Sequence, residues 1–183
     1  DLVQSTIDMN EPRPPEQLII NPNGWIPVLI GDVAIYEAAA ITIYLCDQYP
    51  LAGLAPRPDQ MTRGLFLQTL VYFSSSIQNA FQLTYYPDRF AETSDGYSGV
   101  MQRGIRRLRE TWQVIDTQIG ENQWVLGDKF SAVDIYLFML TTWLKDSRGH
   151  PSVQDFPSVA RIAKKVLLRP ATLKVYSEAL QIK

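Results

Sequence analysis

Two amphipathic stripes in the second part of the chain constrain the fold more than any other feature. The first stripe consists of apolar residues at i+3 and i+4 spacing: Phe66, Leu70, Phe73, Ile77 and Phe81. The second advances in strict 4-3-4-3-4 steps: Met101, Ile105, Leu108, Trp112, Ile115 and Ile119. This period is that of a helix buried along one face. The chain from about residue 58 onward is therefore predicted to be a helical bundle.

Three further helices complete the predicted bundle. Residues 131–144 are apolar nearly all round, which predicts the buried central helix. A shorter amphipathic pattern follows at Val159, Ile162, Ala163, Val166 and Leu167, and Pro170 interrupts it. A last helix is expected from Leu173, Tyr176 and Leu180.

Ser131 and Asp134 have the spacing of a capping box, with Phe130 and Ile135 at the positions of a hydrophobic staple. The N–H groups at the start of a buried helix need partners, and these two side chains can supply them. We therefore expect Ser131 and Asp134 to have a structural role and not a catalytic one.

The first 50 residues differ from the rest because they contain short β-like runs and most of the turn signals. A strand is expected over 2–9, before prolines at 12, 14 and 15. Two apolar runs, 26–30 and 33–36, are joined by Gly31-Asp32, which predicts a hairpin with a two-residue type II′ loop. A helix is expected over 38–48, ended by Pro50. These patterns predict a domain over 1–50, a linker over 51–58 and a helical domain over 58–183.

Composition excludes several classes of function. The net charge is −2 with 17 Lys and Arg, so no strong field favours nucleic acid or an anionic membrane. The arginines at 103, 106, 107 and 109 are interpreted as a solvated helix face.

The single cysteine, Cys46, lies in an apolar helix and is expected to be a structural thiol. His150 has no second His or clustered Cys beside it, so we expect no metal site.

Two motifs resemble the cytosolic glutathione transferase family. One is Asn21-Pro22-Asn23-Gly24-Trp25-Ile26-Pro27-Val28-Leu29, followed by Tyr36-Glu37-Ala38-Ala39-Ala40-Ile41. The other is Gly127-Asp128-Lys129-Phe130-Ser131-Ala132-Val133-Asp134. The resemblance covers nearly the whole chain. It implies an α/β plus all-α fold, in which a partial thioredoxin-like amino-terminal domain precedes an all-helical carboxy-terminal domain.

The resemblance also implies a glutathione site with residues in named roles. Pro27 is expected to follow a cis peptide bond, so that the N–H and C=O of Ile26 pair with the cysteinyl backbone of glutathione. Glu37 would take the ammonium of the γ-glutamyl group, and the helix N–H groups at Ala38 would take its carboxylate. An acidic residue at a helix start that binds no ligand is the alternative for Glu37.

Two positions of this expected site depart from the family pattern. The residue after Glu37 is usually serine, and Ala38 keeps the N–H but lacks the hydroxyl. Trp25 stands where a polar or basic residue is common. A hydrogen bond to a charged group contributes about 1.5–3 kcal/mol, so both departures bear on affinity for glutathione.

The resemblance implies a second substrate as well, an apolar electrophile. Its pocket is expected to be lined from the first bundle helix by Tyr72, Ser76, Gln78 and Phe81, although core packing explains Phe81 equally well. The family is usually a cytoplasmic homodimer that acts in detoxification. Its β1-α1 unit has no counterpart in the printed sequence, so the activating Ser, Tyr or Cys is expected to precede Asp1 and its identity is unknown.

Three functions remain open at this point. The first is a glutathione transferase that directs the thiolate at an electrophile. The second is a transferase-like binding or structural protein without turnover, which Ala38 and Trp25 favour. The third is a glutathione-dependent thiol–disulfide oxidoreductase or dehalogenase, which a cysteine as the activating residue would favour.

Overall fold

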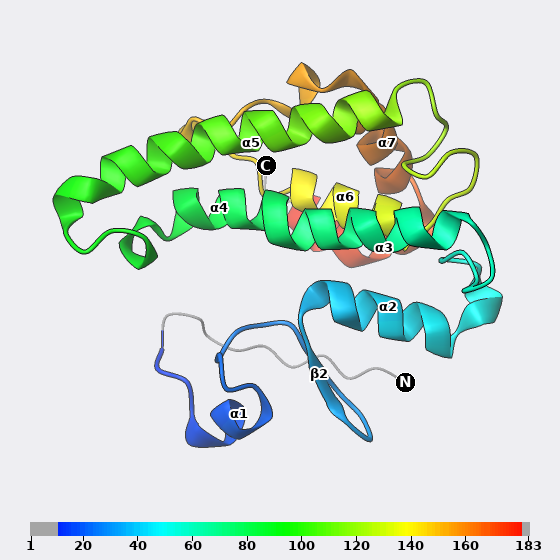
Figure 1. Ribbon diagram of the computed structural model, residues 1–183, viewed down its shortest axis with the longest axis horizontal. Coiled ribbons are helices and arrows are strands. Elements are labelled where there is room, and N and C mark those ends of the chain that lie inside the picture. Colours follow the sequence, from blue (N-terminus) through cyan, green and yellow to red (C-terminus); the bar gives the residue numbers. More distant parts are fainter. Residues whose placement is uncertain (1–10, 181–183) are drawn as a thin grey trace. The chain divides into compact units, whose positions relative to one another are not determined.

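A computed structural model describes residues 11–180 of the chain (Figure 1). It contains two compact units, one up to Tyr44 and one from Leu45 onward. The division falls within a single helix, α2 (Ala38–Gln48). The strand expected over 2–9 lies outside the described residues, and the domain limits expected at 50 and 58 remain predictions.

The first unit contains a short helix and a β-hairpin. The helix is α1 (Pro15–Ile20), and the hairpin pairs β1 (Val28–Ile30) with β2 (Ala34–Tyr36) in antiparallel register. Helix α1 was not among the predicted elements. Its signal was nevertheless present, because proline is favoured at the first helical position and Glu16 favours the first turn.

The hairpin was predicted correctly, but its loop was not. Ile30 pairs with Ala34, so the loop has three residues, 31–33, in place of the predicted two. A type II′ turn needs positive φ at its first central residue, and Gly31 does not have it. The observed register sets Leu29 opposite Ile35, and both are half-buried. Because side chains alternate along a strand, a slip by one residue would move Leu29 or Ile35 to the other face.

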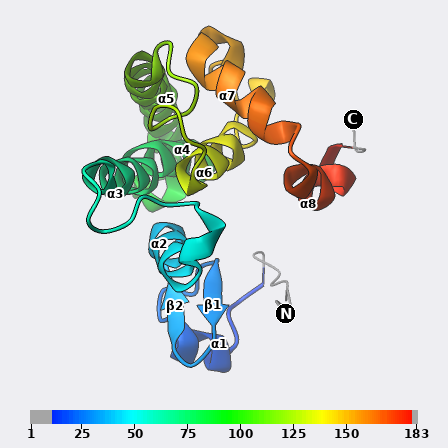
Figure 2. The ribbon, with the colours of Figure 1, turned by 90° about the vertical axis from the view of Figure 1, so that its right-hand side faces the viewer.

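The second unit is helical. Its main elements are a long segment formed by α3 (Thr62–Tyr72), a π-helical turn (Phe73–Ile77) and α4 (Gln78–Tyr85), followed by α5 (Tyr97–Ile119), α6 (Ala132–Thr141), α7 (Pro157–Leu167) and α8 (Pro170–Leu180). Figure 2 shows α3 and α5 nearly end-on, with α6 and α7 running obliquely beside them. Among residues 11–180 no strand follows Tyr36, and only the isolated bridge Trp124–Gly127 is β-like.

The predicted stripes form the core of this bundle. All five apolar residues of the first stripe are at most 1% exposed. The second stripe is fully buried from Leu108 onward, whereas Met101 and Ile105 are half-buried. The arginines off this stripe are exposed or half-exposed: Arg103 and Arg107 both pair with Glu110. Both stripe predictions are confirmed.

The close approach of α4 and α5 depends on Gly104. A Cβ added at Gly104 would lie 2.7 Å from Thr84 Cγ2 and 2.8 Å from Leu83 Cβ. These are closer than van der Waals contact, so the two helices can pack at this distance only where one of them lacks a side chain. Figure 1 shows α4 and α5 running side by side.

We expect Gly104→Ala to lower the free energy of unfolding by about 1–2 kcal/mol, because overpacking at the α4–α5 contact outweighs the better helix propensity of alanine. Gly99 is the matched control in the same helix, since a Cβ there would meet nothing within 4 Å. Gly99→Ala should stabilise the protein by about 0.5–1 kcal/mol. Urea denaturation measures both. Equal effects of the two substitutions would contradict the role given to Gly104.

The central helix α6 is shorter than predicted. It ends at Thr141, and not at Leu144, because the N–H groups of Trp143 and Leu144 bond three residues back in a tighter turn.

The next helix, α7, obtains its amino-terminal cap from a distant residue. Asp116 Oδ1 on α5 accepts from the N–H groups of Ser158 and Val159, at 2.8 and 3.0 Å. This buried contact joins α5 to α7 and has no signal in the local sequence.

Candidate functional site

The segment Trp25–Pro27 leads into β1 and exposes much of its surface. The Ile26–Pro27 peptide bond is cis, as the resemblance implied. Trp25 and Ile26 are 43% and 52% exposed. Within the described chain, neither the N–H nor the C=O of Ile26 has a hydrogen-bond partner. The backbone of Ile26 is therefore able to pair with an extended ligand.

Hydrogen bonds from the side chains of Asn21 and Arg13 hold the turn before this segment. Asn21 is only 3% exposed; its Nδ2 donates to the Trp25 carbonyl at 2.7 Å, and its Oδ1 accepts from the Asn23 N–H at 3.1 Å. Arg13 Nε donates to the Gly24 carbonyl at 2.8 Å. Gly24 has φ +65°, and a Cβ there would come within 2.9 Å of Arg13 Cγ. Sequence reasoning did not assign a role to Asn21 or Arg13.

Glu37 and Ala38 form the amino end of α2. The first helical hydrogen bond runs from the Ile41 N–H to the Glu37 carbonyl, so the N–H groups of the first turn have no partner inside the helix. Glu37 is exposed and has φ +73°, a conformation uncommon for a residue with a side chain. Such outliers are often found at ligand-binding positions. The end of α2 can therefore accept a carboxylate at its N–H groups, with an acidic side chain beside it.

The hairpin register brings these two segments together. Val28 and Tyr36 are its last pair, so Pro27 and Glu37 leave the open end of the hairpin side by side. The Cα atoms of directly opposite residues in an antiparallel pair, such as Val28 and Tyr36, lie about 4.5–5.5 Å apart. The structure thus gathers Ile26, Pro27, Glu37 and Ala38 at one end of one hairpin, as a common site requires.

The residues predicted for the second-substrate pocket make contacts in different directions. The Tyr72 hydroxyl donates to the Thr111 carbonyl of α5 at 3.3 Å. Gln78 Oε1 instead accepts from the Tyr136 hydroxyl of α6. Ser76, on the π-helical turn, is half-buried. The pocket that these residues would line stays a prediction.

Phe81 belongs to a buried aromatic cluster. It is 1% exposed, and its ring lies edge-on to Trp143 and to His150, at 5.6 and 5.7 Å between centroids. Both nitrogens of His150 are engaged: Nδ1 accepts from the Lys145 N–H, and Nε2 lies 3.0 Å from Thr84 Oγ1. Burial, with the Arg148 charge adding to it, lowers the pKa of His150. Phe81 and His150 therefore serve the packing of this unit.

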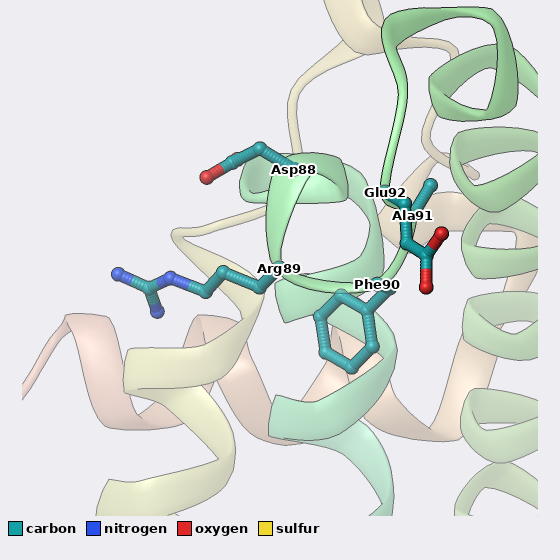
Figure 3. Close-up of a pocket in the computed structure, with 5 residues that line it drawn as sticks. All are labelled: Asp88, Arg89, Phe90, Ala91 and Glu92. Carbon is teal, nitrogen blue, oxygen red and sulfur yellow. The ribbon is translucent and has the colours of Figure 1, made fainter.

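An open hollow lies at the end of α4, lined by residues 88–92 (Figure 3). Its volume is about 380 Å³. Asp88, Arg89 and Glu92 bring charges of both signs to it, with Phe90 as the large apolar side chain. The hollow includes none of the residues predicted for either substrate.

Cys46 lacks the features of a reactive thiol. Cys46 is half-buried, and burial, followed by the nearby Asp47 carboxylate, raises the pKa of its thiol. A thiol held protonated is a weak nucleophile, so Cys46 fits a structural role. The described part of the chain contains no group of three His, Cys, Asp or Glu residues able to hold a metal ion. It likewise contains no helix long and apolar enough to span a membrane.

Ser131 and Asp134 meet at the start of α6. Asp134 is fully buried; one of its oxygens accepts from the Ser131 N–H and the other from the Val125 N–H, both at 2.8 Å. Burial raises the pKa of Asp134, although these hydrogen bonds act in the opposite direction. The pair forms a capping box, and it also ties the loop at Val125 to the helix.

Comparison with known proteins agrees with this architecture. Residues 98–163 match the family model described as "Glutathione S-transferase, C-terminal domain". Glutathione S-transferase F10 of Arabidopsis thaliana is 30% identical over 150 residues, which is 73% of this chain and 64% of the relative. Glutathione S-transferase F14 of the same plant is 26% identical over 162 residues, 85% of this chain and 64% of the relative.

Solved structures match over nearly the whole chain. A sphingomonad glutathione S-transferase complexed with glutathione superposes with a TM-score of 0.75 at 26% identity, over 91% of this chain and 79% of that one. The chain is similar in sequence and in fold to cytosolic glutathione transferases. A glutathione transferase homologue from Sulfitobacter with bound glutathione shares the fold, with a TM-score of 0.80 at 24% identity over 91% of this chain and 79% of that one. The chain has the expected fold class, a partial thioredoxin-like domain followed by a helical domain. It spans 64% of the length of the two Arabidopsis relatives.

Proposed function

We propose that this protein binds glutathione and directs its thiolate at an apolar electrophilic small molecule. The observation that carries the proposal is the open end of the hairpin, where the backbone of Ile26, which has no partner among residues 11–180, lies beside the amino end of α2. Solved structures of two similar proteins contain glutathione, which supports the same ligand here.

In this proposal each part of the site recognises one part of the tripeptide. The Ile26 N–H and C=O pair with the cysteinyl backbone in the manner of a short antiparallel strand. Glu37 takes the γ-glutamyl ammonium, and the N–H groups at Ala38 and Ala39 take the carboxylate. Trp25, exposed next to Ile26, forms the rim of the site.

The chemical step is displacement or addition at the electrophile by the glutathione thiolate. A hydrogen-bond donor that stabilises the thiolate increases its fraction at neutral pH and so its rate of attack. The resemblance implies a Ser or Tyr as this donor, or a Cys that would instead form a mixed disulfide with glutathione. In the same proposal the second substrate is an apolar electrophile, and the protein is a homodimer located in the cytoplasm.

A second function is favoured by Ala38. The serine hydroxyl that the family pattern places at this position is missing, which suits a binding or structural protein without turnover. A conjugation assay separates the two functions: the full-length protein is mixed with glutathione and 1-chloro-2,4-dinitrobenzene, and thioether formation is followed by absorbance. Turnover above the uncatalysed rate supports the enzyme, whereas saturable glutathione binding without turnover supports the second function.

Ala38→Ser should tighten glutathione binding about fivefold to thirtyfold, because a hydroxyl would add a hydrogen bond to the charged carboxylate worth about 1–2 kcal/mol. Titration calorimetry on the full-length protein measures the change. Ala40→Ser is the matched control: Ala40 is exposed on the same helix, about 200° away round its axis. Equal affinities of the Ala38→Ser variant and the wild type would show that the carboxylate does not lie at this helix start.

A further inference from the structure

Asn21 has an unusual concentration of hydrogen bonds for a turn residue. Its backbone N–H ends α1 on the Gln17 carbonyl, and its C=O accepts from the Gly24 N–H at 2.8 Å. Its side chain adds the contacts with Asn23 and Trp25 described above, and it is nine-tenths or more buried. A surface turn needs only part of this network, since the Asn21–Gly24 bond alone closes it.

The contact with Trp25 acts on the neighbouring residue. The Trp25 C=O and the Ile26 N–H belong to one planar peptide unit, in which they point in opposite directions. Asn21 Nδ2 holds the C=O at 2.7 Å, which fixes the direction of the Ile26 N–H at the opposite edge of the same peptide unit. Within residues 11–180 this N–H has no partner.

We propose that Asn21 is a positioning residue for glutathione, which orients the Trp25–Ile26 peptide so that the Ile26 N–H meets the cysteinyl carbonyl of the ligand. The inference rests on the proposed glutathione site. Arg13 assists by holding the adjacent Gly24 carbonyl, so two consecutive carbonyls are anchored before the ligand arrives. Anchoring in advance lowers the ordering cost of binding.

Asn21→Asp tests this role with little change of shape. The carboxylate keeps the acceptor for the Asn23 N–H and removes the donor to the Trp25 carbonyl. We expect its dissociation constant for glutathione to rise about tenfold. The dissociation constant for γ-glutamylethylamide, which keeps the γ-glutamyl end and lacks the cysteinyl carbonyl, should change less than twofold. Asn23→Asp is the matched control, because Asn23 is exposed and lies two residues away.

The two ligands, titrated by NMR, separate the possible outcomes. Loss of affinity for glutathione alone supports the positioning role, whereas equal loss for both ligands, or for neither, overturns it. Asn21→Ser provides a second variant if Asn21→Asp does not fold, since serine accepts locally but does not reach the Trp25 carbonyl. If the wild type binds γ-glutamylethylamide and glutathione with equal affinity, the Ile26 N–H makes no contact with the cysteinyl carbonyl and the inference is wrong, although a γ-glutamyl site remains. If the wild type binds neither glutathione nor γ-glutamylethylamide, both the inference and the proposed function are wrong.

Discussion

Glu37→Ala should weaken glutathione binding about tenfold to a hundredfold. The γ-glutamyl ammonium would lose its only proposed counter-charge, and a hydrogen bond between charged groups contributes about 1.5–3 kcal/mol. Glu37 is exposed at the end of the hairpin and makes no ion pair within residues 11–180, so its carboxylate is available to a ligand. Titration calorimetry with glutathione measures the loss.

Glu37→Gln separates the charge of Glu37 from its shape, and Asp32→Ala is the matched control. Glu37→Gln keeps the side-chain length and should lose most of the same affinity. Asp32→Ala removes an exposed carboxylate from the loop of the same hairpin and should change the dissociation constant less than twofold. If Glu37→Ala and Ala38→Ser both leave affinity unchanged, the assignment of glutathione to this site is wrong.

Asp134→Ala should lower the free energy of unfolding by about 3–5 kcal/mol. The substitution removes a fully buried carboxylate and leaves the N–H groups of Val125 and Ser131 without acceptors. Each buried donor left unpaired costs about 1–3 kcal/mol, and the loss of a helix cap adds to this. Urea denaturation followed by circular dichroism measures the change.

The control for Asp134 lies in the same loop. Asp128→Ala removes an exposed carboxylate of the second motif and should change the free energy of unfolding by less than about 0.5 kcal/mol. Binding of glutathione to folded Asp134→Ala protein should be unaffected, since the role of Asp134 is structural. A folded, fully stable Asp134→Ala variant would contradict this role.

The helical bundle could be predicted because its signals are periodic. The stripe from Phe66 to Phe81 continues through the π-helical turn, and the proline at 170 marks the break between α7 and α8. The hairpin loop could not be predicted from Gly31-Asp32, because burial of Leu29 and Ile35, and not the loop residues, sets the register. Side-chain contacts distant in sequence, such as Asp116 with the start of α7, leave no local pattern.

The proposed glutathione site could be predicted from the sequence only in part. Ile26 and Glu37 were predicted from motifs, but their proximity depends on the hairpin register. The positive φ of Glu37 is a property of the folded backbone. The sequence contained Asn21 and Arg13 without indicating their contacts, because Arg13 lies eleven residues from the carbonyl it binds. For the second substrate, the resemblance implied Phe81, with core packing as an equal alternative, and the structure buries Phe81 against His150.

Titration calorimetry of the full-length wild-type protein with glutathione measures whether the proposed site binds its ligand. We expect saturable binding with one glutathione per chain. We also expect cysteinylglycine, which lacks the γ-glutamyl group recognised by Glu37 and the start of α2, to bind at least tenfold more weakly. Absence of binding heat at millimolar glutathione, or equal affinity for the two ligands, would contradict the proposed site.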